Sequence, residues 1–166
     1  MDENTNTILA QLQDNMRQQS HVTASADLQP GDIVYYDMDR ADGITHTGGY
    51  GSRLKYVVVA GTKSNRKEVC AVLINTANTH SPDPDWQAEQ YLIRRMDYPA
   101  ILDHDSWIDC TDPKELKVSK IKANNSEKKG RLNPRDLANM MRHLKENSFI
   151  DPHTRKVYGI DKYMPL

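Results

Sequence analysis

Cysteine, phenylalanine and tryptophan are scarce in this chain, which has two Cys, one Phe and two Trp among its 166 residues. Cys70 and Cys110 each stand in an apolar, strand-like run with no second cysteine nearby, so the sequence has no CxxC metal or redox motif. We therefore expect buried free thiols and not a disulfide framework. A hydrophobic fraction of 37% predicts a modest core, which must rest on Val, Ile, Leu, Met and Tyr.

Long hydrophobic runs and an excess of one charge are missing as well. No run approaches the roughly 20 apolar residues that a membrane-spanning helix needs. The acidic, polar start MDENTNT does not resemble a signal peptide. We expect a cytoplasmic protein that has no membrane partner. Because the formal net charge is -1, a nucleic-acid site would have to be a local basic patch.

The length suits one domain with short appendages. Residues 1–20 predict a polar amphipathic helix, and residues 21–27 are typical of a linker, so an N-terminal helical arm and linker are expected over 1–27. The apolar residues of this helix fall at helical spacing: Ile8, Leu9, Leu12 and Met16. The main domain is expected over residues 28–150, and residues 151–166 are expected to form a tail along the surface.

Short strand-like runs with turn residues between them dominate the central part of the chain. Polar connections are expected at residues 37–52, 61–67 and 79–86, and a charged surface turn at residues 122–130. The runs themselves cover residues 33–36, 56–60, 69–74, 91–93 and 106–110. This spacing predicts a mainly β protein with a small, curled antiparallel sheet or barrel.

The clearest helix signal follows these strands. Asn133 is a good N-cap, and Pro134 suits the first helical position. The apolar residues after them fall on one helical face: Leu137, Met140, Met141 and Leu144. We expect this helix to close the open side of the sheet.

Several short patterns occur in the order in which the MazF/PemK toxins carry them, and the chain resembles that family over about residues 28–147. In chain order, the patterns are Gly31-Asp32-Ile33-Val34, a glycine-bearing loop over 48–52, a basic residue before the aliphatic run Tyr56-Val57-Val58-Val59, the strand end Asn75-Thr76, Asp105-Ser106 before Trp107-Ile108, and Leu132-Asn133 opening the last helix.

The resemblance implies a small SH3-like, PemK-type β-barrel with a C-terminal helix, to which this chain adds an N-terminal helix. It also implies a sequence-selective endoribonuclease toxin of a type II toxin-antitoxin module, which cleaves single-stranded RNA. A cognate antitoxin and a second copy of the chain, as a homodimer, are the implied partners. No cofactor or metal is implied, since the chain offers no carboxylate cluster for two metal ions.

The chain departs from the family pattern at the site. The loop has no Glu, strict register puts Lys55 at the usual arginine position, and Lys114 stands in the segment where a second arginine is usual. A relative that binds RNA or protein without efficient cleavage is therefore the alternative hypothesis. Gyrase poisoning, as in the CcdB family, is a third, but the C-terminal Tyr163-Met164-Pro165-Leu166 does not match it.

The candidate catalytic residues are Arg53, Lys55, Thr76 and His46. The planar fork of an arginine matches phosphate oxygens. Arg53 and Lys55 share one strand parity, so both can flank a phosphate. Thr76 could donate a hydrogen bond to a phosphate oxygen or cap a turn. His46 could act as a general acid or base, because an imidazole titrates near neutral pH, or it could be merely exposed.

The candidate RNA-binding residues are Tyr50, Ser52, Asn75 and Asn78. Tyr50 stands among glycines and could stack on an unpaired base. Tyr56, Trp86 and Trp107 are expected to be packing residues. The run Asp103-His104-Asp105 has no further ligands at suitable spacing, so a turn is expected there and not a metal site.

Overall fold

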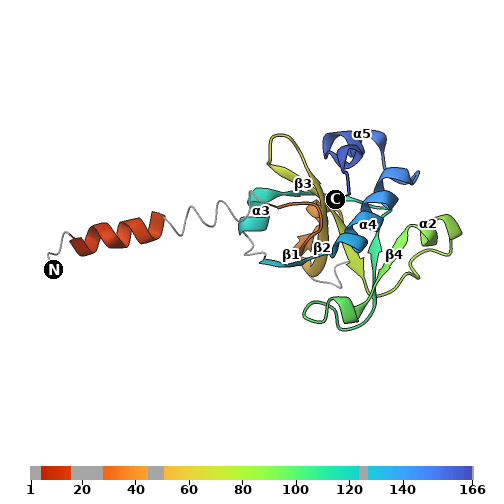
Figure 1. Cartoon of the computed structure of the whole chain (residues 1–166), viewed down its shortest axis with the longest axis horizontal. Helices are drawn as coiled ribbons and strands as arrows, with labels where there is room; N and C mark the ends of the chain where they lie inside the picture. Colours follow the sequence, from red (N-terminus) through yellow and green to blue (C-terminus); the bar gives the residue numbers. More distant parts are fainter. Residues whose placement is uncertain (1–4, 16–27, 45–50, 124–126, 166) are drawn as a thin grey trace.

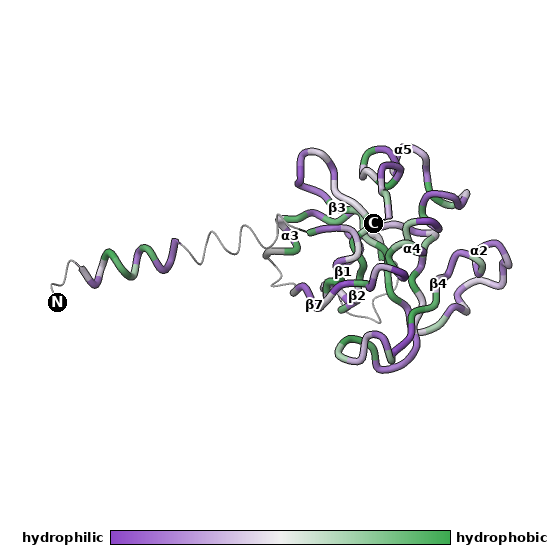
Figure 2. Tube along the Cα trace, viewed as in Figure 1, coloured by the Kyte–Doolittle hydropathy of each residue, from purple (hydrophilic) through white to green (hydrophobic). Residues whose placement is uncertain are grey.

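The computed structural model describes residues 5–15, 28–44, 51–123 and 127–165 (Figure 1). The expected N-terminal helix is present over 5–15, where Ile8, Leu9 and Leu12 are all exposed. Figure 2 shows hydrophobic and hydrophilic residues alternating along this helix. Met16 and the expected linker over 21–27 lie outside the described residues.

The main body is an antiparallel sheet of seven strands, which confirms a mainly β protein with α-helices. Its hydrogen-bonded order is β4-β5-β3-β2-β1-β7, and β6 pairs with β3 beside this path. The strand bounds are β1 Asp32–Asp39, β2 Ser52–Thr62, β3 Glu68–Asn75, β4 Gln90–Ile93, β5 Ser106–Asp109, β6 Lys114–Lys117 and β7 Glu127–Arg131. Strands β4 and β7 lie at the two ends of this path, and among the described strands they do not pair with each other. The sheet is therefore open and is not a hydrogen-bonded barrel.

Helices α4 (Pro134–Glu146) and α5 (Pro152–Val157) cover one face of the sheet. The apolar face of α4 that the sequence predicts is buried against the sheet, and the Asn133 side chain caps the helix by accepting from the Asp136 N–H. In Figure 1, α4 and α5 lie on the right of β1, β2 and β3, and α3 lies on their left. The larger core therefore lies between the sheet and α4.

The other face of the sheet is covered over β1, β2 and β3 by β6 and by α3 (Val118–Ala123). The buried residues thus form two cores, one on each face of the sheet, because successive side chains of a strand point to opposite faces. On β1, Val34, Tyr36 and Met38 enter the second core, whereas Ile33 enters the core under α4. With both faces buried, β2 needs the continuous apolar run Val57 to Ala60.

Three expectations about the connections were wrong, and one strand was not predicted. The loop over 37–52 is shorter, because β1 reaches Asp39, the 3-10 helix η1 covers Arg40–Asp42 and β2 already starts at Ser52. The loop over 79–86 runs into helix α2 (Pro84–Ala88), which Asp83 caps. Parts of the turn expected over 122–130 belong to α3 and β7. Strand β6 was not predicted, because its sequence KELK has one buried apolar residue, Leu116.

The C-terminal segment is not a surface tail. After α5 it forms the 3-10 helix η3 (Ile160–Lys162), and both Tyr158 and Ile160 are buried in the core under α4. A Cβ on Gly61 would lie 2.2 Å from the Tyr158 carbonyl oxygen, so the segment packs directly on the backbone of β2. Both cysteines are buried and free, as expected. Of the described helices, none has the length and apolar character to cross a membrane.

Candidate functional site

One row of side chains crosses five strands on the face opposite α4. Residues directly opposite each other in an antiparallel pair project to the same face. Tyr36 is opposite Lys55, Asn75 is opposite Trp107, and Trp107 is opposite Leu92. A hydrogen bond from Lys55 Nζ to Asn75 Oδ1, at 3.4 Å, joins the two halves of the row. Tyr36 is buried in the second core, whereas the row emerges half-buried at Lys55, Trp107 and Leu92.

Lys55 is the central cation of this row. Its side chain is half-buried, and it donates its hydrogen bond to the neutral amide of Asn75, which is itself buried. Burial lowers the pKa of the Lys55 ammonium, and the neighbouring positive charge of Arg53 lowers it further. A lysine with a lowered pKa in a partly exposed position is typical of functional sites.

Arg53 lies two residues before Lys55 on β2 and shares its face, which confirms the parity that the sequence predicts. Its side chain is exposed. Within the described parts of the chain, no carboxylate forms an ion pair with Arg53 or Lys55. Two neighbouring cations without a protein counter-ion form a local site for an anion, although the whole chain is nearly neutral.

Trp107 is the residue of this site that the sequence interpretation missed. It was expected to be a packing residue, but its side chain is half-buried next to Asn75 and Leu92. The signal was present in the alternation of β5, where Ile108 is fully buried in the core under α4 and Trp107 must face the other way. By contrast, Tyr56 packs against that core, as expected. Its ring also contacts Tyr35, with ring centroids 4.5 Å apart.

The other predicted residues are less closely joined to this row. Ser52 is opposite Asp39 on β1 and has the parity opposite to that of Arg53. Thr76 directly follows β3 and is exposed, and Asn78 is half-buried in the connection beyond it. His46 and Tyr50 lie outside the described residues, so their roles stay predictions.

The potential metal-binding side chains of the described ranges do not gather in one place. No group of three or more His, Cys, Asp or Glu that could hold an ion occurs in those ranges. At the Asp103-His104-Asp105 run, the Asp105 carboxylate accepts from the Arg95 backbone N–H, and the His104 ring nitrogen Nδ1 contacts the Asp105 carbonyl oxygen at 2.9 Å. These are local turn contacts.

The site thus combines an exposed guanidinium, a half-buried ammonium with a lowered pKa, and an indole ring on one sheet face. Such a set can bind a phosphate through the cations and stack a base on the indole. Searches of the chain against protein-family models and against curated proteins gave no match.

Proposed function

We propose that the chain is an endoribonuclease that binds single-stranded RNA on the row from Lys55 to Trp107 and cleaves it without a metal ion. The observation that carries the proposal is the pairing of Arg53, which has no ion pair in the described region, with the half-buried Lys55 on the same face. The Trp107 indole, two strands away from Lys55, adds the aromatic surface that single-strand binders use.

In the proposed reaction, Arg53 holds the non-bridging phosphate oxygens with its planar fork. The ribose 2′-oxygen attacks phosphorus, and its proton passes to a base, for which His46 remains the sequence-based prediction. The bond from phosphorus to the 5′-oxygen breaks, and Lys55 gives its proton to that oxygen. The products are a 2′,3′-cyclic phosphate and a 5′-hydroxyl. A lowered pKa suits Lys55 for this step, because it makes the ammonium a better acid at neutral pH.

The resemblance to the MazF/PemK toxins extends this proposal. It adds a PemK-type, SH3-like fold, a homodimer, and neutralisation of the toxin by a cognate antitoxin. The order of elements supports it: a Gly-Asp-Ile-Val strand, the basic start of β2, β3 ending at Asn75, and α4 after Leu132. Sedimentation at micromolar concentration tests the dimer, and a monomer mass alone would contradict it.

A second candidate function is RNA binding without cleavage. It is favoured by one observation: the described row has no carboxylate and no imidazole that could accept the proton of the 2′-hydroxyl. In that case the same cations and indole would bind RNA, and binding would weaken with salt because phosphate contacts release counter-ions.

The deciding experiment incubates the purified protein with single-stranded RNA in EDTA. We expect cleavage, with Arg53→Ala and Lys55→Ala each slowing it roughly a hundredfold to a thousandfold and Thr76→Ala slowing it less. Lys67→Ala is the matched control, because Lys67 is an exposed cation just before β3, at the end of that strand far from Asn75. Cleavage that needs added Mg²⁺, or equal rates in the Arg53, Lys55 and Lys67 variants, would contradict the proposal. Binding without cleavage would support the second candidate.

A further inference from the structure

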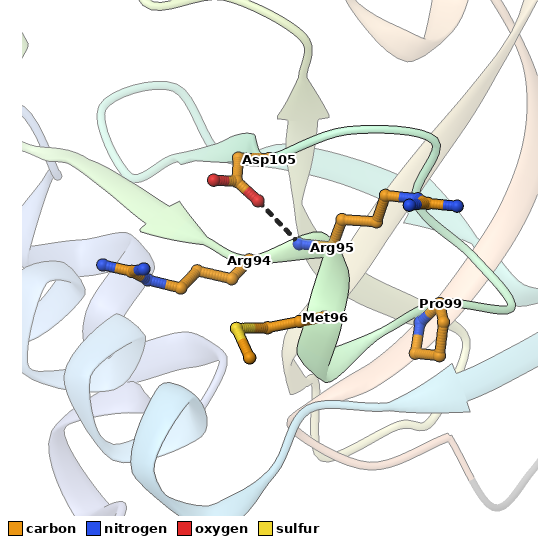
Figure 3. Close-up of a pocket in the computed structure, with 5 residues that line it drawn as sticks. All are labelled: Arg94, Arg95, Met96, Pro99 and Asp105. Carbon is orange, nitrogen blue, oxygen red and sulfur yellow. Dashed lines mark hydrogen bonds between the residues drawn. The ribbon is translucent and has the colours of Figure 1, made fainter.

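A second cationic feature lies at the outer edge of the sheet, just after β4. A pocket of about 360 Å³ lies there, and its lining residues are Arg94, Arg95, Met96, Pro99 and Asp105 (Figure 3). The guanidinium groups of Arg94 and Arg95 point to opposite sides of the short 3-10 helix η2 (Arg95–Asp97), and Met96 extends from the same helix. The lining therefore combines two cations with an apolar surface.

The charges of this pocket are only partly compensated. Arg94 and Arg95 are both exposed, and neither has an ion pair with a described residue. Asp105, the one acidic residue of the lining, accepts from the Arg95 backbone N–H at 2.9 Å rather than from a guanidinium. The nearby Asp97 is paired with Arg135, at 3.1 Å. Both guanidinium groups are therefore available to contact a ligand anion.

The apolar part of the pocket includes a large hydrophobic side chain that is largely exposed to solvent. Met96 is 78% exposed, the highest value among the exposed large hydrophobic residues described. Pro99 is also exposed and lines the same pocket, on the other side of the η2 ribbon in the view of Figure 3. The thioether of Met96 is flexible and can pack on a planar group that enters the pocket, and the Pro99 ring adds apolar area to the lining.

The sheet connects this pocket to the row that contains Lys55. Leu92 ends that row on β4, and Arg94 follows it by two residues in an extended conformation, so both have the same strand parity. Lys55 and Leu92 are three strand spacings apart, which is about 14 Å. A single-stranded RNA that crosses the sheet from Lys55 over Trp107 would therefore need more than one nucleotide to reach Arg94.

We propose that this pocket is a second nucleotide subsite, in which a base packs on Met96 and Pro99 while Arg94 and Arg95 hold the phosphates on its two sides. The inference rests on the proposed function, because it assigns the neighbouring part of the same RNA strand. An acidic peptide is the competing occupant. The continuity with Trp107 and Lys55, together with the apolar surface between the two cations, favours RNA.

The test measures binding of 2′-O-methylated single-stranded oligonucleotides of mixed sequence, which lack the attacking hydroxyl and stay intact. One probe has about eight nucleotides and can span both sites; the other is a dinucleotide. Arg94→Gln with Arg95→Gln, and separately Met96→Ser, should weaken binding of the longer probe roughly tenfold and leave the dinucleotide unchanged. The slope of the logarithm of the binding constant against the logarithm of the salt concentration should become shallower by about 0.7 for each phosphate that the variant no longer neutralises. Lys67→Gln is the matched charge control.

The outcomes separate this subsite from the proposed function. If Arg53→Ala weakens both probes while the Arg94, Arg95 and Met96 variants bind like the parent, the subsite is wrong and the proposed function stands. If neither probe binds, both are wrong. If a poly-glutamate peptide binds and the Arg94 and Arg95 substitutions abolish that binding but not RNA binding, the pocket is a peptide site and the inference is overturned. Circular dichroism and thermal melting verify that each variant is folded.

Discussion

The Lys55 ammonium on β2 donates a hydrogen bond to the Asn75 side-chain oxygen at the end of β3, over 3.4 Å. The partner is neutral and buried, so it orients the cation without compensating its charge. This is why burial, with Arg53 nearby, lowers the pKa of Lys55 instead of raising it as a carboxylate partner would. The charge remains available for a phosphate.

Asn75→Asp therefore tests the role of that neutral partner. A carboxylate at this position should raise the pKa of Lys55 and form an ion pair with it. The high-pH limb of the cleavage profile, where Lys55 loses its acidic proton, should move to higher pH, and RNA binding should weaken. A pH–rate profile of parent and variant measures the shift. An unchanged high-pH limb would mean that Lys55 is not the acid.

Lys55→Met should change how stability depends on pH. The folded-state pKa of Lys55 is lower than the unfolded value of about 10.5, so between the two values the unfolded chain binds more protons. The parent should thus gain stability as pH rises through that window, and the Met variant should lack this gain. Urea unfolding of both proteins at pH 7 and above pH 10 gives the comparison. Parallel pH dependence in both would contradict the lowered pKa.

Trp107 provides a direct optical test of the row. The chain has two tryptophans, so Trp86→Phe leaves Trp107 as the one fluorophore of that type. Trp86 lies in α2, outside the row, with its ring near His80. Adding single-stranded RNA to this variant should quench the emission if a base stacks on the indole. In the reciprocal Trp107→Phe variant, the Trp86 emission should not respond, and a response there would place the RNA elsewhere.

Asp136 should be the most sensitive polar position for stability. Its buried carboxylate accepts from Tyr91 Oη at 2.7 Å and from Tyr98 Oη at 2.5 Å, and thus ties α4 to β4 and to the segment after η2. Asp136→Ala leaves hydroxyl groups without this acceptor and should lower the free energy of unfolding by about 3 kcal/mol. Asp151→Ala, at the exposed N-cap of α5, should cost about 1 kcal/mol. If urea unfolding gives equal losses of stability for Asp136→Ala and Asp151→Ala, the buried hydrogen bonds of Asp136 contribute no more than an exposed N-cap, and the prediction is wrong.

Local patterns in the sequence were sufficient for the parts of the fold whose stability is local. The N-cap at Asn133 and the apolar spacing of α4 predicted that helix because capping and amphipathicity act within a few turns. The apolar runs predicted the cores of β1, β2 and β3 for the same reason. Strand β7 has no such local signal: in EKKGR the pairing with β1, and the ion pairs of Lys128 and Arg131 with the buried Asp32, stabilise the strand.

The site, like the fold, has some features that follow from local sequence and others that depend on tertiary contacts. The sequence alone determined that Arg53 and Lys55 share a face, because strand parity is a property of the backbone. Only the tertiary structure decided that Asn75 is the partner of Lys55, that Trp107 joins their row, and that Tyr158 and Ile160 enter the core. These contacts join residues 20 or more positions apart, and strand order and register decide them, since a shift of one residue would move each side chain to the opposite face.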